Sequence, residues 1–261
     1  MFASSFSETV PDPDDGKYHI TAENFDAKAM EHVMNIVHVK TKRLPQKLDL
    51  ELLAHIAVLV NYYDMKDAIS FHAEIWAKAA ARNKFSVKYG RDVVLRTFVA
   101  RAFSDATDEN FKRGADFILQ HSTGPVPDIG LPTLGLADML DERRCKAIQV
   151  MLNRINHLGR DIESHKWGCS DACRAMLLGS FLMKCRALRS SGVRLNQLQQ
   201  PFVGFSFHDL TQKLSDCASS FTWYSRRDGN ELNHQCDLVE FVETAVKAGK
   251  VTLEKKFDDM A

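Results

Sequence analysis

The sequence lacks an excess of charge of either sign. Lys and Arg number 34, Asp and Glu also number 34, and the formal net charge is zero. General binders of nucleic acids or of membrane surfaces carry a basic excess, so the composition argues against both partners. No run of residues approaches the roughly 18 apolar residues of a membrane span, and we therefore expect no membrane segment.

Targeting and redox signals are also missing. The amino-terminal run MFASSFSETVPDPDDGK has neither the basic start nor the apolar stretch of a secretory signal. The six Cys lie within helical patterns and form no C-x-x-C pair. Without an export signal these thiols are expected to stay reduced, which places the protein in the cytoplasm or the nucleus.

Catalytic motifs are absent from the printed sequence. It contains no HExxH, no Walker loop and no glycine fingerprint for dinucleotides. Gly179 and Ser180 lie within a continuous helical pattern with no strand before them, which is not a nucleophile elbow. Carboxylate pairs fall in loops and at helix starts, where capping explains them. We expect no enzyme, no catalytic residue and no cofactor.

Strand patterns are scarce, and the sequence predicts a mainly α fold. Tyr18–Thr21 is the one short strand expected. Leu48 to Ala79 is the central stretch, and it reads as two helices joined back to back. Asp49 should cap the first, which should bury Leu53 and Ile56. Asp64 should cap the second, and its inner face is predicted to consist of Ala68, Phe71, Ile75 and Ala79.

Further helices are predicted downstream. The Gly- and Pro-rich loop Ser122 to Gly135 should separate them into two groups. Thr107 should cap the helix before this loop. Helices are then expected over residues 138–164, 171–188, 206–217 and 231–248, the last one stopped by Gly249. They should form a bundle with one apolar cluster made by Leu152, Ile155, Leu178, Leu182, Leu214 and Val239.

Several runs, in this order, resemble the second half of a BTB/POZ domain and the helical continuation found in a group of fungal BTB proteins. They are MFASSFSE, DAKAMEHVMNIVHVK, LPQKLDLELLAHIAVLVNYYDMKDAISFHAEIW, the run from YGRDVVLRTFVARAF to QHSTGPV, CSDACRAMLLGSFLMKC, PFVGFSFHDL and NHQCDL. The resemblance implies a partial BTB/POZ-like region at residues 1–80, linking helices at 81–122 and a C-terminal helical bundle at 136–261.

The first strands and helices of a complete BTB domain have no counterpart before MFASSFSE. The expectation is a chain that lacks the amino-terminal half of that domain, either because the gene product is truncated or because the chain begins at an internal Met. Phe2 and Phe6 should then pack on the 50–80 helices, and an apolar surface should remain open where the missing strands would lie.

The resemblance implies a non-enzymatic protein–protein interaction module. In the wider family such modules self-associate or link a target to a cullin-type ubiquitin ligase, so other proteins are the expected partners. A ubiquitin-ligase substrate adaptor and a transcription-linked nuclear regulator remain as alternatives, although the neutral charge disfavours nucleic acid as a partner.

Cys217, His234 and Cys236 form the most metal-like group of residues, and Cys169 or Cys173 could complete four zinc ligands. Their spacing matches no standard zinc finger, and free Cys is a common core residue. Packing without a metal is therefore the preferred interpretation, with zinc as the alternative.

Basic and aromatic clusters have similarly simple explanations. A basic loop could act as a nuclear address or bind acidic partners, but a solvated turn is preferred; it contains Lys40, Lys42, Arg43 and Lys47. A solvated helix face is expected for Arg143, Arg144 and Lys146. Tyr62, Tyr63 and Trp76 could anchor an interface, but at least two of them are expected in the core.

Overall fold

The fold is mainly α-helical. The computed structural model describes residues 11–17, 24–81, 88–103, 108–190, 192–219, 236 and 238–254, and no strand occurs among them. The predicted strand at Tyr18–Thr21, and Phe2 and Phe6, lie outside the described residues. No helix in the described ranges combines the length and the apolar character needed to cross a membrane.

The chain divides into two compact units, residues 1–114 with 128–133, and residues 115–127 with 134–261. It passes from one unit to the other within a helix, α5 (Glu109–His121), and twice more in the loop after it. Asp108 caps α5, because its carboxylate accepts hydrogen bonds from the backbone N–H groups of Asn110 and Phe111. The predicted cap, Thr107, is outside the described residues.

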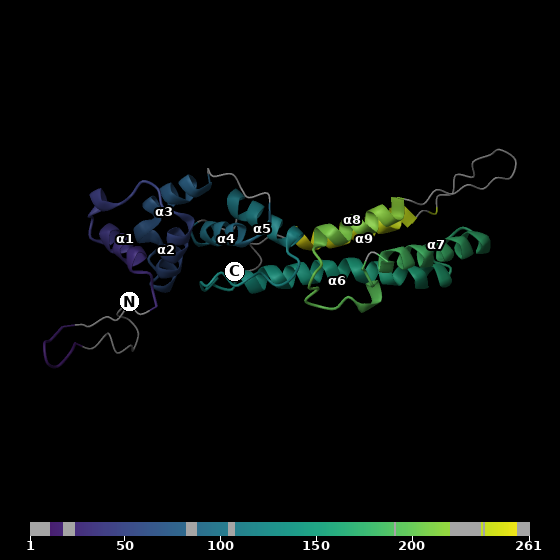
Figure 1. Cartoon of the computed structure of the whole chain (residues 1–261), viewed down its shortest axis with the longest axis horizontal. Helices are drawn as coiled ribbons and strands as arrows, with labels where there is room; N and C mark the ends of the chain where they lie inside the picture. Colours follow the sequence, from purple (N-terminus) through teal and green to yellow (C-terminus); the bar gives the residue numbers. More distant parts are fainter. Residues whose placement is uncertain are drawn as a thin grey trace. The chain divides into compact units, whose positions relative to one another are not determined.

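The first unit is built around α2 (Figure 1). Its helices are α1 (Ala27–Val37), α2 (Leu50–Tyr62), α3 (Lys66–Ala81) and α4 (Arg91–Phe103), with a short 3₁₀ turn at Thr41–Arg43. The Asp49 carboxylate accepts a hydrogen bond from the N–H of Leu52 and caps α2, as predicted. The other three helices all pack on α2, which buries Leu53 and Ile56 completely.

Helix α3 faces the core with a different stripe from the one predicted. Ile69, Ala73 and Trp76 are buried, whereas Phe71 and Ile75 are exposed. The predicted cap is also wrong, because α3 starts only at Lys66 and Asp64 takes a positive φ of 52° in the turn before it. Both stripes repeat at helical spacing, so periodicity alone could not decide which one the core would bury.

Leu53→Ala should lower the free energy of unfolding by about 2–5 kcal/mol, since it removes a fully buried side chain and leaves a cavity. The matched control is Leu182→Ala, the same change at a side chain that is 59% exposed. Denaturant melts of both variants measure the difference, and a loss under about 1 kcal/mol for Leu53→Ala would contradict the assigned core.

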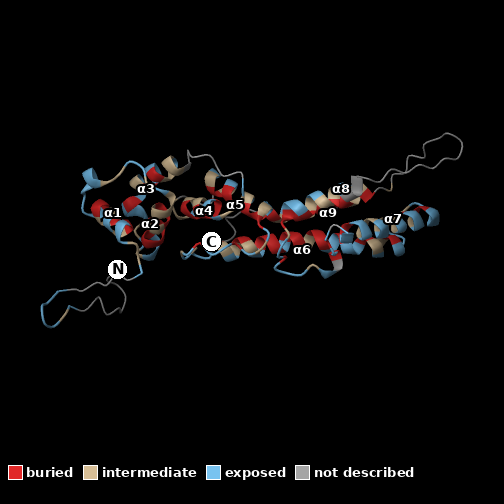
Figure 2. Ribbon diagram, viewed as in Figure 1, coloured by how far each residue is buried: buried red, intermediate tan, exposed pale blue. Residues whose placement is uncertain are grey.

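The second unit contains a set of packed helices. They are α6 (Leu136–Glu163), α7 (Asp171–Ser190), α8 (Phe207–Ser219) and α9 (Leu238–Leu253), with a 3₁₀ turn at Leu195–Gln197. The longest, α6, packs most extensively on α9, and Figure 2 shows buried residues along much of its length. Leu152, Ile155 and Leu214 are buried as predicted.

Two predictions about α7 and α9 are wrong. Leu182 does not join the cluster but is exposed, and Met176 and Met183 of the same helix are exposed as well, so α8 and α9 leave part of the apolar surface of α7 uncovered. Gly249 does not stop the last helix, because α9 continues to Leu253.

Gly249 permits a close approach inside the second unit. A Cβ atom at this position would lie 2.7 Å from Cε2 of Phe207 and 3.2 Å from the carbonyl oxygen of Ala147. Both distances are shorter than ordinary van der Waals contact, so a Cβ at position 249 would force the Phe207 ring and the α6 backbone to shift.

Gly249→Ala should therefore destabilise the protein, by about 1–3 kcal/mol, as overpacking does in other cores, although Ala is intrinsically the better helix former. Gly179→Ala is the matched control: Gly179 lies exposed in α7, a Cβ there would meet nothing within 4 Å, and the change should stabilise by up to about 1 kcal/mol. Thermal unfolding of both variants measures the two changes in stability, which should have opposite signs. Changes of the same sign would contradict the close packing at Gly249.

Candidate functional site

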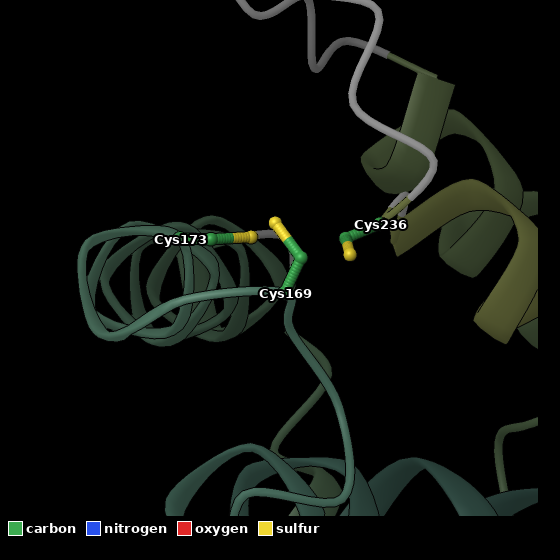
Figure 3. A group of neighbouring side chains, drawn as sticks. All are labelled: Cys169, Cys173 and Cys236. Carbon is green, nitrogen blue, oxygen red and sulfur yellow. The ribbon is translucent and has the colours of Figure 1, made fainter.

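Three cysteine side chains converge in the second unit. The Sγ atoms of Cys169, Cys173 and Cys236 all lie within 4.8 Å of one another. Figure 3 shows Cys173 on α7, Cys169 in the turn before this helix, and Cys236 in the segment that leads into α9. The structure thus joins one of the sequence candidates, Cys236, with both cysteines that the sequence offered as possible further ligands. The side chain of Cys217 and all of His234 lie outside the described residues.

The turn between α6 and α7 holds two of these cysteines in place. The Ser170 hydroxyl accepts a hydrogen bond of 3.2 Å from the N–H of Cys173 and so caps α7. Gly168 has a φ of +109°, and a Cβ there would lie 2.5 Å from Cγ of Arg174. The Arg174 guanidinium donates to the Gly168 carbonyl and pairs with Asp171.

The surroundings of the cysteines are largely apolar. Cys173 belongs to a buried cluster with Leu177 and Leu238, and Cys236 and Trp167 pack against it. The Trp167 ring meets Phe241 edge to face at 5.6 Å, and its indole N–H is buried and has no hydrogen-bond partner in the structure. Burial, followed by hydrogen bonding with Cys173 and Cys169, raises the pKa of the Cys236 thiol.

Among the described residues, this cysteine group is the one whose side chains could hold a metal ion. Three thiols could coordinate a thiophilic cation after losing their protons, or two of them could be oxidised to a disulfide. The C-x₃-C spacing of Cys169 and Cys173 places both at the start of α7. Sequence reasoning could detect that pair but could not tell which distant cysteine the fold would bring to it.

The basic run on α6 is not the solvated face that the sequence predicted. Arg143 is buried and Arg144 is only 1% exposed, although Lys146 is exposed as expected. The Arg144 guanidinium donates to the carbonyl oxygens of Pro201, at 2.6 Å, and Phe205, at 3.5 Å. It thereby ties the loop before α8 to α6.

Asp141 extends this buried network to the loop after α5. Its Oδ2 accepts a hydrogen bond of 2.7 Å from the Val126 N–H, and its Oδ1 lies 3.6 Å from Nε of Arg144, an ion pair too long for a hydrogen bond. Burial raises the pKa of Asp141, while the Val126 N–H and Arg144 act in the opposite direction. The group links two loops to one helix, a structural role.

Arg144→Ala should lower the free energy of unfolding by about 2–4 kcal/mol, because it leaves the two carbonyls unpaired and removes the cation beside Asp141. Lys146→Ala, two residues away on the exposed side of α6, should change it by less than about 0.5 kcal/mol. Urea titration of both variants measures their free energies of unfolding. If both variants lose equally little, Arg144 does not anchor the loop to α6.

The aromatic candidates divide between the core and the surface. Trp76 is buried, and its indole N–H donates to the carbonyl oxygen of Pro45 at 2.9 Å. Tyr62 is exposed and Tyr63 is half-buried. The Tyr62 ring meets the Phe25 ring edge to face, and the Tyr63 ring lies tilted against it. The prediction that at least two of the three would be core residues is therefore wrong, because only Trp76 is fully buried.

The outer face of α3 is an exposed apolar surface on the first unit. Phe71 is 69% exposed and Ile75, one turn later, is 42% exposed. Charged side chains of both signs flank them on the same helix, including a Glu74–Lys78 ion pair. The residues of the predicted basic loop, in contrast, are exposed to solvent, as a solvated turn would be.

A cavity in the second unit has a volume of about 350 Å³ and lies among α5, α8 and α9. Polar side chains of mixed charge line it, among them Asp116, His208 and Lys250. His121 lies beside it, with its ring 4.9 Å from that of His208. Burial and the neighbouring His208 lower the pKa of His121, which favours its neutral imidazole.

Comparisons of the chain with protein-family models, with curated proteins and with solved structures find no match.

Proposed function

We propose that this protein is a non-enzymatic protein–protein interaction module, and that the outer face of α3, defined by Phe71 and Ile75, is a contact surface. The observation that carries the proposal is that α3 has two apolar stripes. One stripe, with Ile69, Ala73 and Trp76, is buried in the first unit, while the second stripe faces outward.

Exposing a large aromatic side chain gains nothing for the isolated fold. Full burial of a Phe or Ile side chain contributes about 1.5–3 kcal/mol. Phe71, which is 69% exposed, forgoes most of that contribution, and Ile75, which is 42% exposed, forgoes part of it. Adjacent exposed apolar side chains with a charged border are typical of protein contact sites. The ion-paired Glu74 and Lys78 supply such a border with no net charge.

The kind of partner follows from the same surface. A flat apolar stripe on a helix suits another helix or strand with its own apolar face, and the balanced charge of the chain gives nucleic acid no electrostatic advantage. The partner is therefore another protein chain. The likeness of the sequence to BTB/POZ domains supports this proposal and suggests either a second copy of the chain or a cullin-type ligase subunit.

The double variant Phe71→Ser/Ile75→Ser should weaken association by at least about tenfold, since each side chain would otherwise be desolvated in the contact. Both side chains are exposed, so the fold should lose less than about 1 kcal/mol. Sedimentation velocity over a range of concentrations measures self-association, and titration with a purified cullin-type subunit measures the other partner.

Val251→Ser is the matched control, because Val251 is an exposed apolar residue of α9, far along the chain from α3. It should associate as the wild type does. A wild-type chain that stays monomeric and binds no protein, or a double variant that associates with unchanged affinity, would contradict the proposed surface.

A further inference from the structure

We propose that Cys169, Cys173 and Cys236 bind a zinc ion that fastens the start of α9 to the start of α7. This inference is independent of the proposed interaction function, which concerns the other unit. It rests on the convergence of three sulfur atoms from two segments more than 60 residues apart in the sequence.

The distances suit a thiolate metal site. Zinc binds cysteine sulfur at about 2.3 Å in a tetrahedral arrangement, which separates two ligating sulfurs by about 3.8 Å. The three Sγ atoms lie within 4.8 Å of one another, so shifts of about 1 Å or less, within the reach of χ1 adjustments, would bring them to ligand distance. A set made only of sulfur favours zinc over hard cations such as Mg²⁺ or Ca²⁺.

The cluster is also held in a suitable environment. Cys173 lies in the first turn of α7, near the positive end of the helix dipole. The turn that carries Cys169 is fixed by Gly168 and by the Ser170 cap. The buried indole N–H of Trp167, which lacks an acceptor in the structure, belongs to the same apolar cluster.

Ordinary core packing explains Cys173 and part of the burial of Cys236, but not the position of Cys169. Cys173 is buried, but Cys169 is exposed and Cys236 is only partly buried. Exposed thiols do not gather for hydrophobic reasons, whereas a partly exposed edge gives a metal ion a path into the site. The described residues supply three ligands; His234, outside them, takes no part in the argument.

The decisive experiment measures zinc in the full chain, purified under reducing conditions and dialysed against a trace of ZnCl₂. We expect one zinc per chain by elemental analysis, and proton release on zinc addition in weak buffer, because each thiol must lose its proton to coordinate. Replacing zinc with Co²⁺ should give the intense near-ultraviolet sulfur-to-cobalt absorption that only thiolate ligands produce.

Cys169→Ser, Cys173→Ser and Cys236→Ser should each lower zinc affinity by more than about 100-fold, beyond the loss caused by removing an outer-shell partner. Cys185→Ser is the matched control, since Cys185 is a partly buried cysteine of the same helix, α7, but is outside the cluster. It should keep the metal and the cobalt spectrum. Circular dichroism of every variant checks that the helices are retained.

Three results would overturn the proposal. The first is wild-type protein that binds no more zinc than the triple Ser variant. The second is unchanged affinity in the single variants. The third is a disulfide between two of these cysteines that forms even when zinc is present. Mass spectrometry of protein purified under reducing conditions would detect it.

Discussion

The close approach of α9 to α6 at Gly249 is the constraint on which the second unit depends. With no Cβ at this position, the backbone of α9 comes near Ala147 of α6 and the ring of Phe207 of α8. The rest of α9 then lies along α6, and Leu238 at its start packs against Leu158 and Ile162. Cys236 precedes Leu238 by two residues, so the packing of α9 also brings that thiol to the cysteines at the start of α7.

Arg144 adds a polar constraint one turn from this contact. A buried guanidinium is stable only where its donors find acceptors, and the carbonyls of Pro201 and Phe205 provide them. The loop before α8 is therefore held at a defined place on α6, and Phe207, the first residue of α8, arrives where Gly249 leaves room for its ring. Helix packing and buried polar contacts thus support the same arrangement.

The uncovered apolar faces connect this architecture to function. Each unit buries one side of its helices well, and each leaves exposed apolar side chains, Phe71 and Ile75 on α3 and Met183 and Leu182 on α7. The cores are complete without them, as Leu53 and Ile155 show. The proposed interaction function therefore requires no rearrangement of the core, only a partner that covers a helix face already present.

Much of the helical fold could be predicted from the sequence, because apolar spacing and caps are local signals. The Asp49 cap, the buried Leu53 and the buried Leu214 all follow from such patterns. On α3 the pattern failed, since two apolar stripes compete there and only tertiary packing selects one.

The remaining errors also have a tertiary cause. Gly249 looks like a helix terminator until its neighbours Phe207 and Ala147 are known. Arg144 looks like a surface residue until the carbonyls of a loop some 60 positions away reach it. For the candidate site, the sequence offered every cysteine of the cluster and named Cys169 or Cys173 as further ligands beside Cys236. No local rule could decide which of these thiols meet in the fold.

The most direct test of the central claim, that α9 is positioned by the steric fit at Gly249, is a double-mutant cycle between Gly249→Ala and Phe207→Ala. If the added methyl group clashes with the Phe207 ring, removing the ring should relieve the clash. The two changes should then be non-additive by about 0.5–3 kcal/mol, with the double variant more stable than the sum of the single effects predicts. Additivity within about 0.5 kcal/mol would show that the two residues do not meet and would contradict the account.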